Sequence, residues 1–150
     1  MTIIQEGTKD IFRSKCQTLV CPVNTVGVMG AGLAKAFKEK YPGLNAFYRN
    51  ACEEGELTID TLMIWTVPGK KRKVLLFPTK QDWRAPSNIE WIEANLRELA
   101  RFYCALGVES LAMPAVGCGC GGLDWHEQVR DLTYRHLYPI SLQVEIALGK

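Results

Sequence analysis

The residues of this chain that could do chemistry begin with a glycine-punctuated turn, Gly27 to Gly32. An apolar run precedes the turn and a helical pattern follows it, so the segment Leu19–Lys40 predicts a strand, a loop and a helix. The glycines let the backbone adopt positive φ and approach a ligand closely, while the first N–H groups of the helix face the loop. Such a turn favours an anion, above all a phosphate. The alternative is a turn that only connects a strand to a helix.

A second glycine-rich loop spans Ala115–Asp124 and reads AVGCGCGGLD. It follows a predicted strand at Ser110–Met113 and enters a helix whose cap is Asp124. Both loops therefore leave the C-terminal ends of predicted strands, and ligands of open α/β sheets bind at that edge. The agreement between the two loops favours an anion or nucleotide site over a plain connection.

Neither loop completes a familiar nucleotide motif. The first has the glycine spacing of a P-loop, but Leu33 and Ala34 stand where Lys and Ser or Thr are required, which disfavours a nucleotide triphosphatase. The second matches G-x-G-x-x-G at Gly117, Gly119 and Gly122, with room for only one more strand after it. A dinucleotide fold needs several further strands, so that match is weak.

The elements that must position these loops alternate between strands and helices, which predicts crossover connections and a parallel or mixed sheet with helices on both faces. The predicted strands begin at Ile3 and Ile4 and continue with Leu19–Val23, Thr61–Val67, Lys73–Phe77, Ser110–Met113 and Gln143–Leu148. The predicted helices are Gly32–Lys40, Leu44–Glu53, Asn88–Leu106 with Ser87 and Glu90 as a capping box, and one ending near Leu137. Glu6–Phe12 is expected to be a turn that carries Asp10.

Length and charge set broad limits. The 150 residues, with a formal net charge of +2, fit one domain covering residues 1–150 and do not by themselves indicate nucleic acid. No apolar run is long enough to cross a bilayer and the N-terminus lacks a secretory pattern, so we expect a cytoplasmic protein. The basic run Lys70–Lys73, followed by Lys80 and Arg84, could hold phosphate backbones or form a solvated hairpin tip.

The six cysteines do not predict a metal or disulfide framework. There is no C-x-x-C pair, and His126 and His136 do not fall into a zinc pattern with the cysteines. Cys118 and Cys120 sit between glycines, where their small size can matter more than their sulfur. We expect reduced thiols and no metal site.

The chain resembles the macrodomain family in three motifs, which read VNTVGVMGAGLAKAFKEKYPG, FPTKQDWR and MPAVGCGCGGLDW. Within the family it is similar to the branch of the DarG-type DNA ADP-ribosyl glycohydrolases and the terminal ADP-ribose protein glycohydrolases. The resemblance covers almost the whole chain. It implies a three-layer α/β/α fold around a central mixed sheet, with ADP-ribose in a cleft between the two glycine loops and no metal or soluble cofactor.

The resemblance also implies which residues meet the ligand. Asp10 and the backbone of Ile11 would meet the adenine, and Asn24 would sit beside the distal ribose unless it only satisfies local backbone as a turn residue. The other residues expected around the ribose and the diphosphate are Thr25, Val28, Met29, Gly30, Ala31, Gly32, Leu33, Thr79, Val116, Gly117, Cys118, Gly119, Cys120, Gly121 and Gly122.

Lys80 is the catalytic residue that the resemblance implies, together with Asn24. In the family a lysine in the segment equivalent to FPTK faces the glycosidic carbon of the distal ribose. As an ammonium it could protonate or polarise the leaving group, and as a neutral amine it could attack C1 of the opened sugar to form an imine. The sequence leaves both roles open, and by position alone a lysine is usually a solvated surface charge.

Departures from the family pattern bear on the substrate. Protein-directed relatives carry an aspartate in the second loop, where this chain has Gly121. The family often has asparagine where this chain has Cys21, which we treat as tolerated because Asn24 is retained. The GGLDW form resembles the DNA-directed branch. The expected substrate is therefore ADP-ribosylated DNA, with thymidine in single strands as the modified base and Trp83, Arg84, Lys70 and Lys71 as DNA contacts.

Two other functions remain open at this stage. One is a hydrolase of ADP-ribosyl-glutamate on proteins, and the other is a non-catalytic ADP-ribose reader. In the DNA-directed case the protein would be a monomeric antitoxin that reverses, and could contact, a DNA ADP-ribosyltransferase toxin. Such antitoxins often carry a further C-terminal region that this chain lacks, which leaves open whether it is a fragment.

Overall fold

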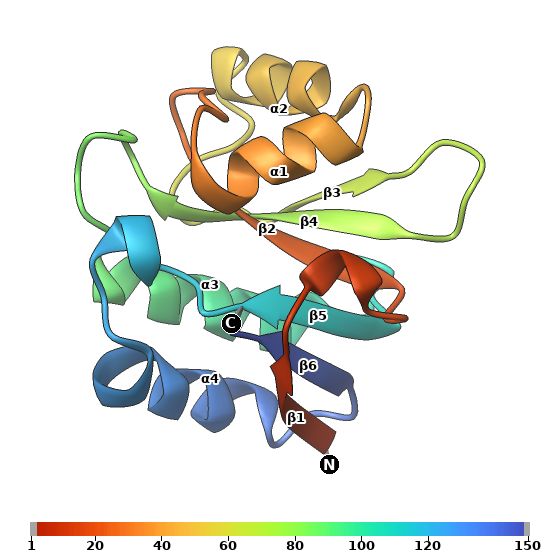
Figure 1. Cartoon of the computed structure of the whole chain (residues 1–150), viewed down its shortest axis with the longest axis vertical. Coiled ribbons are helices and arrows are strands. Elements are labelled where there is room, and N and C mark those ends of the chain that lie inside the picture. Colours follow the sequence, from red (N-terminus) through yellow and green to blue (C-terminus); the bar gives the residue numbers. More distant parts are fainter. Residues whose placement is uncertain (1–2, 149–150) are drawn as a thin grey trace.

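Six strands form one mixed sheet in the computed structural model, which describes residues 3–148 (Figure 1). Across the sheet the order is β1 (Ile3–Thr8), β6 (Gln143–Ala147), β5 (Ser110–Pro114), β2 (Thr18–Asn24), β4 (Lys73–Lys80) and β3 (Met63–Thr66). Neighbouring strands are parallel except β3 and β4, which are antiparallel. The C-terminal ends of β2, β4 and β5 therefore meet at the same edge.

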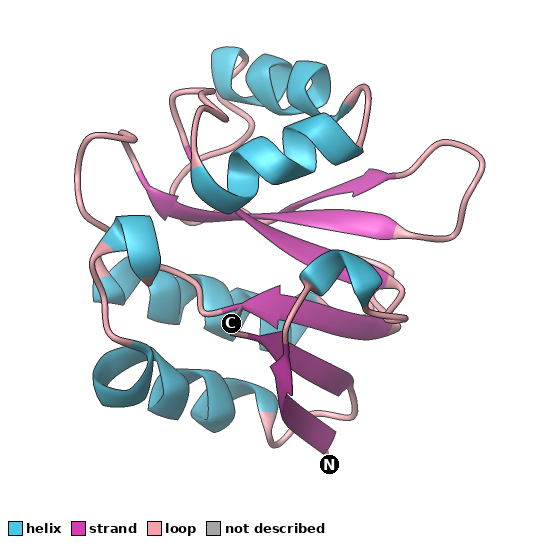
Figure 2. Ribbon diagram, viewed as in Figure 1, coloured by secondary structure: helices cyan, strands magenta, loops and turns pink. Residues whose placement is uncertain are grey.

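Helices cover both faces of the sheet, as Figure 2 shows. They are α1 (Gly32–Lys40) and α2 (Leu44–Glu53) on one face, and α3 (Ile89–Phe102) and α4 (Arg130–Leu137) on the other. Two hydrophobic clusters fill the spaces between the layers, one around Phe37 and Tyr48 and the other around Ile92 and Leu99. The predicted α/β/α architecture with a central mixed sheet is confirmed.

The central position of β2 follows from its composition. Leu19, Val20 and Cys21 are all fully buried, and Val20 packs into a different cluster from its two neighbours. Such a continuous apolar run is typical of a parallel strand covered on both faces. The bounds of α1 and α2 agree with the prediction, because Pro42 and Gly43 separate the two helical patterns.

Several predicted boundaries are wrong. Residues 6–8 were expected in a turn but belong to β1, which ends at Thr8. The turn comes later, as a 3₁₀ turn at Ile11–Arg13 that Asp10 caps. The third helix ends at Phe102 and not Leu106, because the chain turns through 103–106 to reach Gly107 at φ +76°. Its cap is Asn88, whose Oδ1 accepts the Glu90 N–H at 2.8 Å.

β4 runs through Pro78 to Lys80, three residues beyond its predicted end at Phe77. Proline cannot donate to a strand ladder and is usually placed at an irregularity. Here the register shifts between Val23 and Asn24, so that Val23 pairs with Pro78 and Asn24 pairs with Lys80. The shift brings Lys80 to the level of Asn24.

Candidate active site

A cleft of about 780 Å³ opens at the C-terminal ends of the central strands, between the two glycine loops. Most of the predicted ligand residues line it, and it extends from the Asp10 segment to Trp83. The predicted residues that the structure brings together there are Asp10, Ile11, Asn24, Val28, Gly30, Ala31, Gly32, Leu33, Thr79, Lys80, Trp83, Gly117, Cys118, Gly119, Cys120 and Gly121.

Four predicted ligand residues do not line the cleft. Met29 and Val116 point into the core, with exposed fractions of 3% and 0%. Thr25 donates its N–H and hydroxyl to the Gln81 carbonyl, at 3.3 Å and 3.2 Å, and Gly122 donates its N–H to the Gly119 carbonyl at 3.1 Å. These residues shape the loops from behind, and their contact with the ligand stays a prediction.

Asn24 holds the first glycine loop in place. Its Oδ1 accepts backbone N–H groups from Val26, Gly27 and Val28 at 3.1, 3.1 and 3.3 Å. Its Nδ2 donates to the Val28 carbonyl at 2.8 Å. Hydrogen bonds to the local backbone therefore occupy Oδ1 and one N–H of Nδ2, and the second N–H of Nδ2 remains for a ligand.

Tyr48 of α2 supports Asn24 from the core, a contact that no pattern in the sequence indicates. Its hydroxyl lies 2.7 Å from Asn24 Oδ1 and 2.8 Å from the Asn24 carbonyl oxygen. Burial raises the pKa of Tyr48, so the phenol is a neutral donor. Tyr48 is visible in the sequence only as one more apolar position of α2, and its partner lies 24 residues away.

Lys80 bridges the end of β4 and the second glycine loop. Its Nζ donates to the Cys120 carbonyl at 3.1 Å and to the Trp83 carbonyl at 3.4 Å. An ammonium has three N–H donors, so one remains for a ligand in the cleft. The half-buried lysine is thus held at the cleft wall and is not a free surface charge.

The second glycine loop is shaped by close packing against the start of α3. Gly117 has φ +77°, and a Cβ there would lie 2.9 Å from Leu123 and 3.1 Å from Ile92. At Gly121 a Cβ would collide with the Oγ of Ser87, whose N–H also donates to the Gly121 carbonyl at 2.9 Å. A side chain at Gly117 would meet both backbone strain and close contacts, and a side chain at Gly121 would require Ser87 Oγ to move.

The two loops approach each other across the cleft. A Cβ on Gly32, where φ is +58°, would lie 3.6 Å from Cys120 Sγ.

Burial raises the pKa of the Cys118 thiol to about 11, so Cys118 is a neutral thiol near pH 7. Within residues 3–148 no group of three or more His, Cys, Asp or Glu side chains is placed to hold a metal ion.

Other residues line the cleft that sequence reasoning did not single out as ligand contacts. Most of them are small or apolar, and they differ little from ordinary core positions in the sequence. They are Lys9, Pro22, Val23, Ala34, Ser87, Pro114, Ala115, Ala147 and Leu148.

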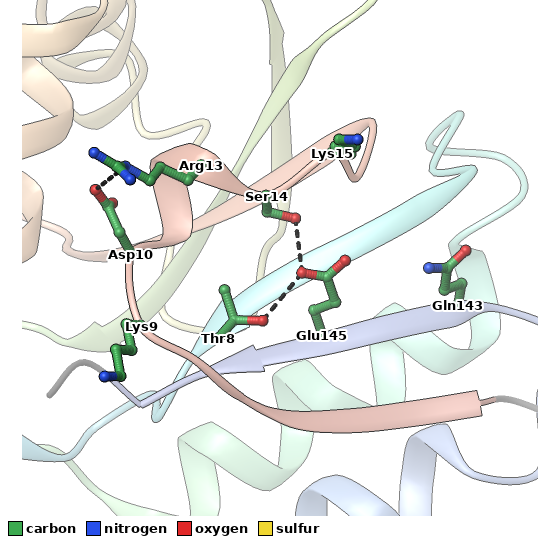
Figure 3. Close-up of a pocket in the computed structure, with 8 residues that line it drawn as sticks. All are labelled: Thr8, Lys9, Asp10, Arg13, Ser14, Lys15, Gln143 and Glu145. Carbon is green, nitrogen blue, oxygen red and sulfur yellow. Dashed lines mark hydrogen bonds and ion pairs between the residues drawn. The ribbon is translucent and has the colours of Figure 1, made fainter.

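Asp10 lies where the cleft meets a second hollow of about 560 Å³, drawn in Figure 3. Its Oδ1 accepts the Phe12 N–H at 3.0 Å and its Oδ2 lies 3.9 Å from Arg13 Nε. In the hollow, Glu145 Oε1 accepts the hydroxyls of Thr8 and Ser14, each at 3.1 Å (Figure 3). Asp10 therefore has a structural role at the 3₁₀ turn and still faces the cleft.

The fold places the predicted DNA contacts in two separate regions. Trp83 is 54% exposed and lines the cleft, and the Arg84 guanidinium lies 5.4 Å from its ring centroid while pairing with Asp82 at 2.8 Å. Lys70 and Lys71 lie in the β3–β4 hairpin, at the far end of β4 from the cleft (Figure 1). At about 3.3 Å per residue, β4 from Lys73 to Lys80 is roughly 23 Å long. The structure therefore does not bring Lys70 and Lys71 to the cleft.

No helix among residues 3–148 combines the length and apolar character that crossing a membrane requires.

The comparisons with known proteins agree with this geometry. The DNA ADP-ribosyl glycohydrolase of Mycobacterium tuberculosis is 41% identical over 128 residues, which are 83% of this chain and 36% of that protein. The macrodomain of Thermus aquaticus DarG superposes with a TM-score of 0.90 at 33% identity, covering 98% of this chain and 99% of that one. Thermosipho africanus DarTG in complex with ADP-ribose gives a TM-score of 0.86 at 37% identity, covering 94% of this chain and 40% of that one.

These relatives differ in how much of their length is matched. The chain spans only about a third of the mycobacterial relative, whereas it covers nearly all of the Thermus aquaticus macrodomain. The Macro domain model itself matches residues 20–131, from within β2 to within α4. With the cleft at the ends of β2, β4 and β5 and this match over most of its length, the chain belongs to the Macro domain family.

Proposed function

We propose that this protein is a hydrolase that removes ADP-ribose from ADP-ribosylated DNA. The observation that carries the proposal is Lys80, held at the wall of the cleft by two carbonyl groups with one N–H to spare. Four relatives at 38–41% identity are DNA ADP-ribosyl glycohydrolases by name, one of them a fusion with a DNA ADP-ribosyl transferase. We infer a cytoplasmic antitoxin that reverses such a transferase.

The shape of the cleft supports ADP-ribose as the bound group. Two glycine loops with positive φ at Gly27, Gly32, Gly117 and Gly119 can turn backbone N–H groups toward a diphosphate between them. Asp10 offers a carboxylate at one end, where an adenine amino group would lie. Lys80 would then stand at the ribose end.

The reaction needs two things from the protein, which are a charged proton donor and groups that position the substrate. Breaking the N-glycosidic bond leaves an oxocarbenium ion at C1 of the distal ribose, water adds to that carbon, and the departing base nitrogen takes up a proton. The spare N–H of the Lys80 ammonium can donate to the leaving group, and the spare N–H of Asn24 can orient a ribose hydroxyl. The imine route needs a neutral Lys80.

A nucleobase fits the rim of the cleft better than an acidic side chain does. Val26, Val28 and Trp83 are 51%, 40% and 54% exposed, and the hydrogen bonds from Thr25 to Gln81 tie their two loops together. An aromatic and aliphatic rim suits base stacking. The loop aspartate expected for protein-directed relatives is replaced by Gly121, where a side chain would collide with Ser87 Oγ as it stands.

The test is to incubate the 150-residue chain with single-stranded DNA carrying ADP-ribosylated thymidine and with an ADP-ribosyl-glutamate peptide. We expect free ADP-ribose and restored thymidine from the DNA, measured by mass spectrometry, and little release from the peptide. Release from the peptide alone would favour the protein-directed hydrolase. Binding of ADP-ribose without release from either substrate would favour a reader.

A further inference from the structure

Ser87 is a buried polar side chain whose hydroxyl finds no partner in the part of the chain that the structure describes. It is 7% exposed, and among residues 3–148 its Oγ has no hydrogen-bond partner. A buried hydroxyl without a partner destabilises the folded state, so such groups are uncommon and call for an explanation. Among residues 3–148, Asn95 Oδ1 is also buried without a hydrogen-bond partner. Asn95 does not line the cleft, whereas Ser87 does.

The surroundings of Ser87 connect it to the second glycine loop. Its N–H donates to the Gly121 carbonyl at 2.9 Å, and its Oγ packs where a side chain on Gly121 would project. Lys80 Nζ donates to the carbonyl of the preceding residue, Cys120, at 3.1 Å. Ser87 and Lys80 therefore hold two consecutive peptide groups of the loop, and Gly121 has no side chain to cover the hydroxyl.

We propose that Ser87 is a ligand-binding residue of the cleft, whose hydroxyl donates a hydrogen bond to an oxygen of the bound ADP-ribose at the second glycine loop. The inference rests on the proposed function, because it takes ADP-ribose as the ligand. Rotation about the Cα–Cβ bond reorients a serine hydroxyl, so the group can exchange its place against Gly121 for a ligand oxygen. The positive N-terminal end of α3, which begins two residues later, favours a negatively charged phosphate oxygen there.

Ser14 provides a matched control for the experiment. It is 6% exposed, but its Oγ donates to Glu145 at 3.1 Å and accepts the Cys16 N–H at 3.1 Å. Ser87→Ala and Ser14→Ala remove the same group from two equally buried sites, one without a partner in the protein and one with two. The binding of ADP-ribose is measured by calorimetry and the Tm of the free protein by scanning calorimetry.

We expect Ser87→Ala to weaken ADP-ribose binding about tenfold while the Tm of the free protein stays the same or rises. Ser14→Ala should lower Tm and leave the affinity unchanged. Unchanged affinity in Ser87→Ala, or a loss of affinity accompanied by a lower Tm, overturns this inference and leaves the proposed function standing. Failure of the wild-type protein to bind ADP-ribose overturns both.

Discussion

Asn24 and Lys80 are register partners at the C-terminal ends of β2 and β4. Without the shift in register after Val23, the partner of Asn24 would be Thr79, because Val23 pairs with Pro78. The irregularity thus makes Lys80 the register partner of Asn24, and both residues line the cleft. The two residues proposed to act on the distal ribose are brought to the same level of the sheet by one backbone feature.

Lys80→Ala tests the proposed chemistry. The change should lower the rate of ADP-ribose release from ADP-ribosylated DNA by about 100-fold or more, since proton transfer by a positioned group contributes roughly 10²–10⁴-fold. Binding of ADP-ribose should persist, because the glycine loops supply most of the contacts in our proposal. Single-turnover release and calorimetric binding measure the two effects separately.

The control for this change is Lys70→Ala, which removes a lysine at the opposite end of β4. We expect release to be unaffected. Equal release by Lys80→Ala and the wild-type protein would refute the mechanism, and a large effect of Lys70→Ala would refute the separation of the hairpin from the site.

Gly121→Ala tests the packing of the second loop. Gly121 does not have positive φ, so alanine meets no backbone strain there and only the collision with Ser87 Oγ opposes it. We expect a loss of about 1–3 kcal/mol in the free energy of unfolding, which is typical of overpacking. Urea unfolding measures the loss.

The second variant in that experiment is Ser87→Ala combined with Gly121→Ala. It removes the colliding oxygen but keeps the Ser87 Cβ, which would lie 3.1 Å from the new methyl group. The double variant should recover part of the lost stability. Simple addition of the two single effects would mean that the loop does not pack against Ser87 as described.

The parts of the site that could be predicted from sequence are those encoded locally. Glycine turns after apolar runs located both loops, and the parallel order of the strands brings their ends together. The mistaken cap illustrates the limit of such local signals, since Ser87 and Asn88 are adjacent and both suit the start of α3. In the structure Asn88 caps the helix, while Ser87 packs against Gly121 in the distant second loop.

The remaining features depend on contacts between distant segments. Pro78 indicates an irregularity in β4 but not which residue becomes the partner of Asn24, and the bond from Tyr48 to Asn24 has no local signature. Only ten positions separate Lys70 from Lys80 in the sequence, which suggests that the two lysines lie close together in space. The antiparallel pairing of β3 with β4 carries the hairpin to the far end of the sheet.

Tyr48→Phe tests the support of the first loop. Removing the hydroxyl takes one donor from Asn24 and leaves the three backbone N–H groups on its Oδ1. We expect a loss of about 1–2 kcal/mol in the free energy of unfolding, together with weaker ADP-ribose binding as the loop loosens. Tyr138→Phe, at a position 47% exposed, should change neither quantity. Equal stability of the two variants would contradict this role of Tyr48.

Glu6→Gln tests whether the Glu6 carboxylate, in the edge strand β1, makes the stability of the fold depend on pH. Burial raises the pKa of Glu6, but hydrogen bonds from Arg130, Tyr134 and Trp125 together outweigh it and lower the pKa below its ordinary value of 4.5. Because the folded pKa is the lower one, ionised Glu6 stabilises the native state above about pH 4.5, and this stabilisation is lost as the pH falls through the folded pKa.

Glu6→Gln should therefore be less stable than the wild-type protein at pH 7, and the difference between them should shrink as the pH falls from about 4.5 toward 3. Urea unfolding at several pH values measures the difference. The control is Glu56→Gln, at an exposed glutamate without an ion pair among residues 3–148, and it should keep the acid sensitivity of the wild-type protein. Parallel stability curves for Glu6→Gln and the wild-type protein would show that β1 is fastened to α4 by contacts other than this carboxylate.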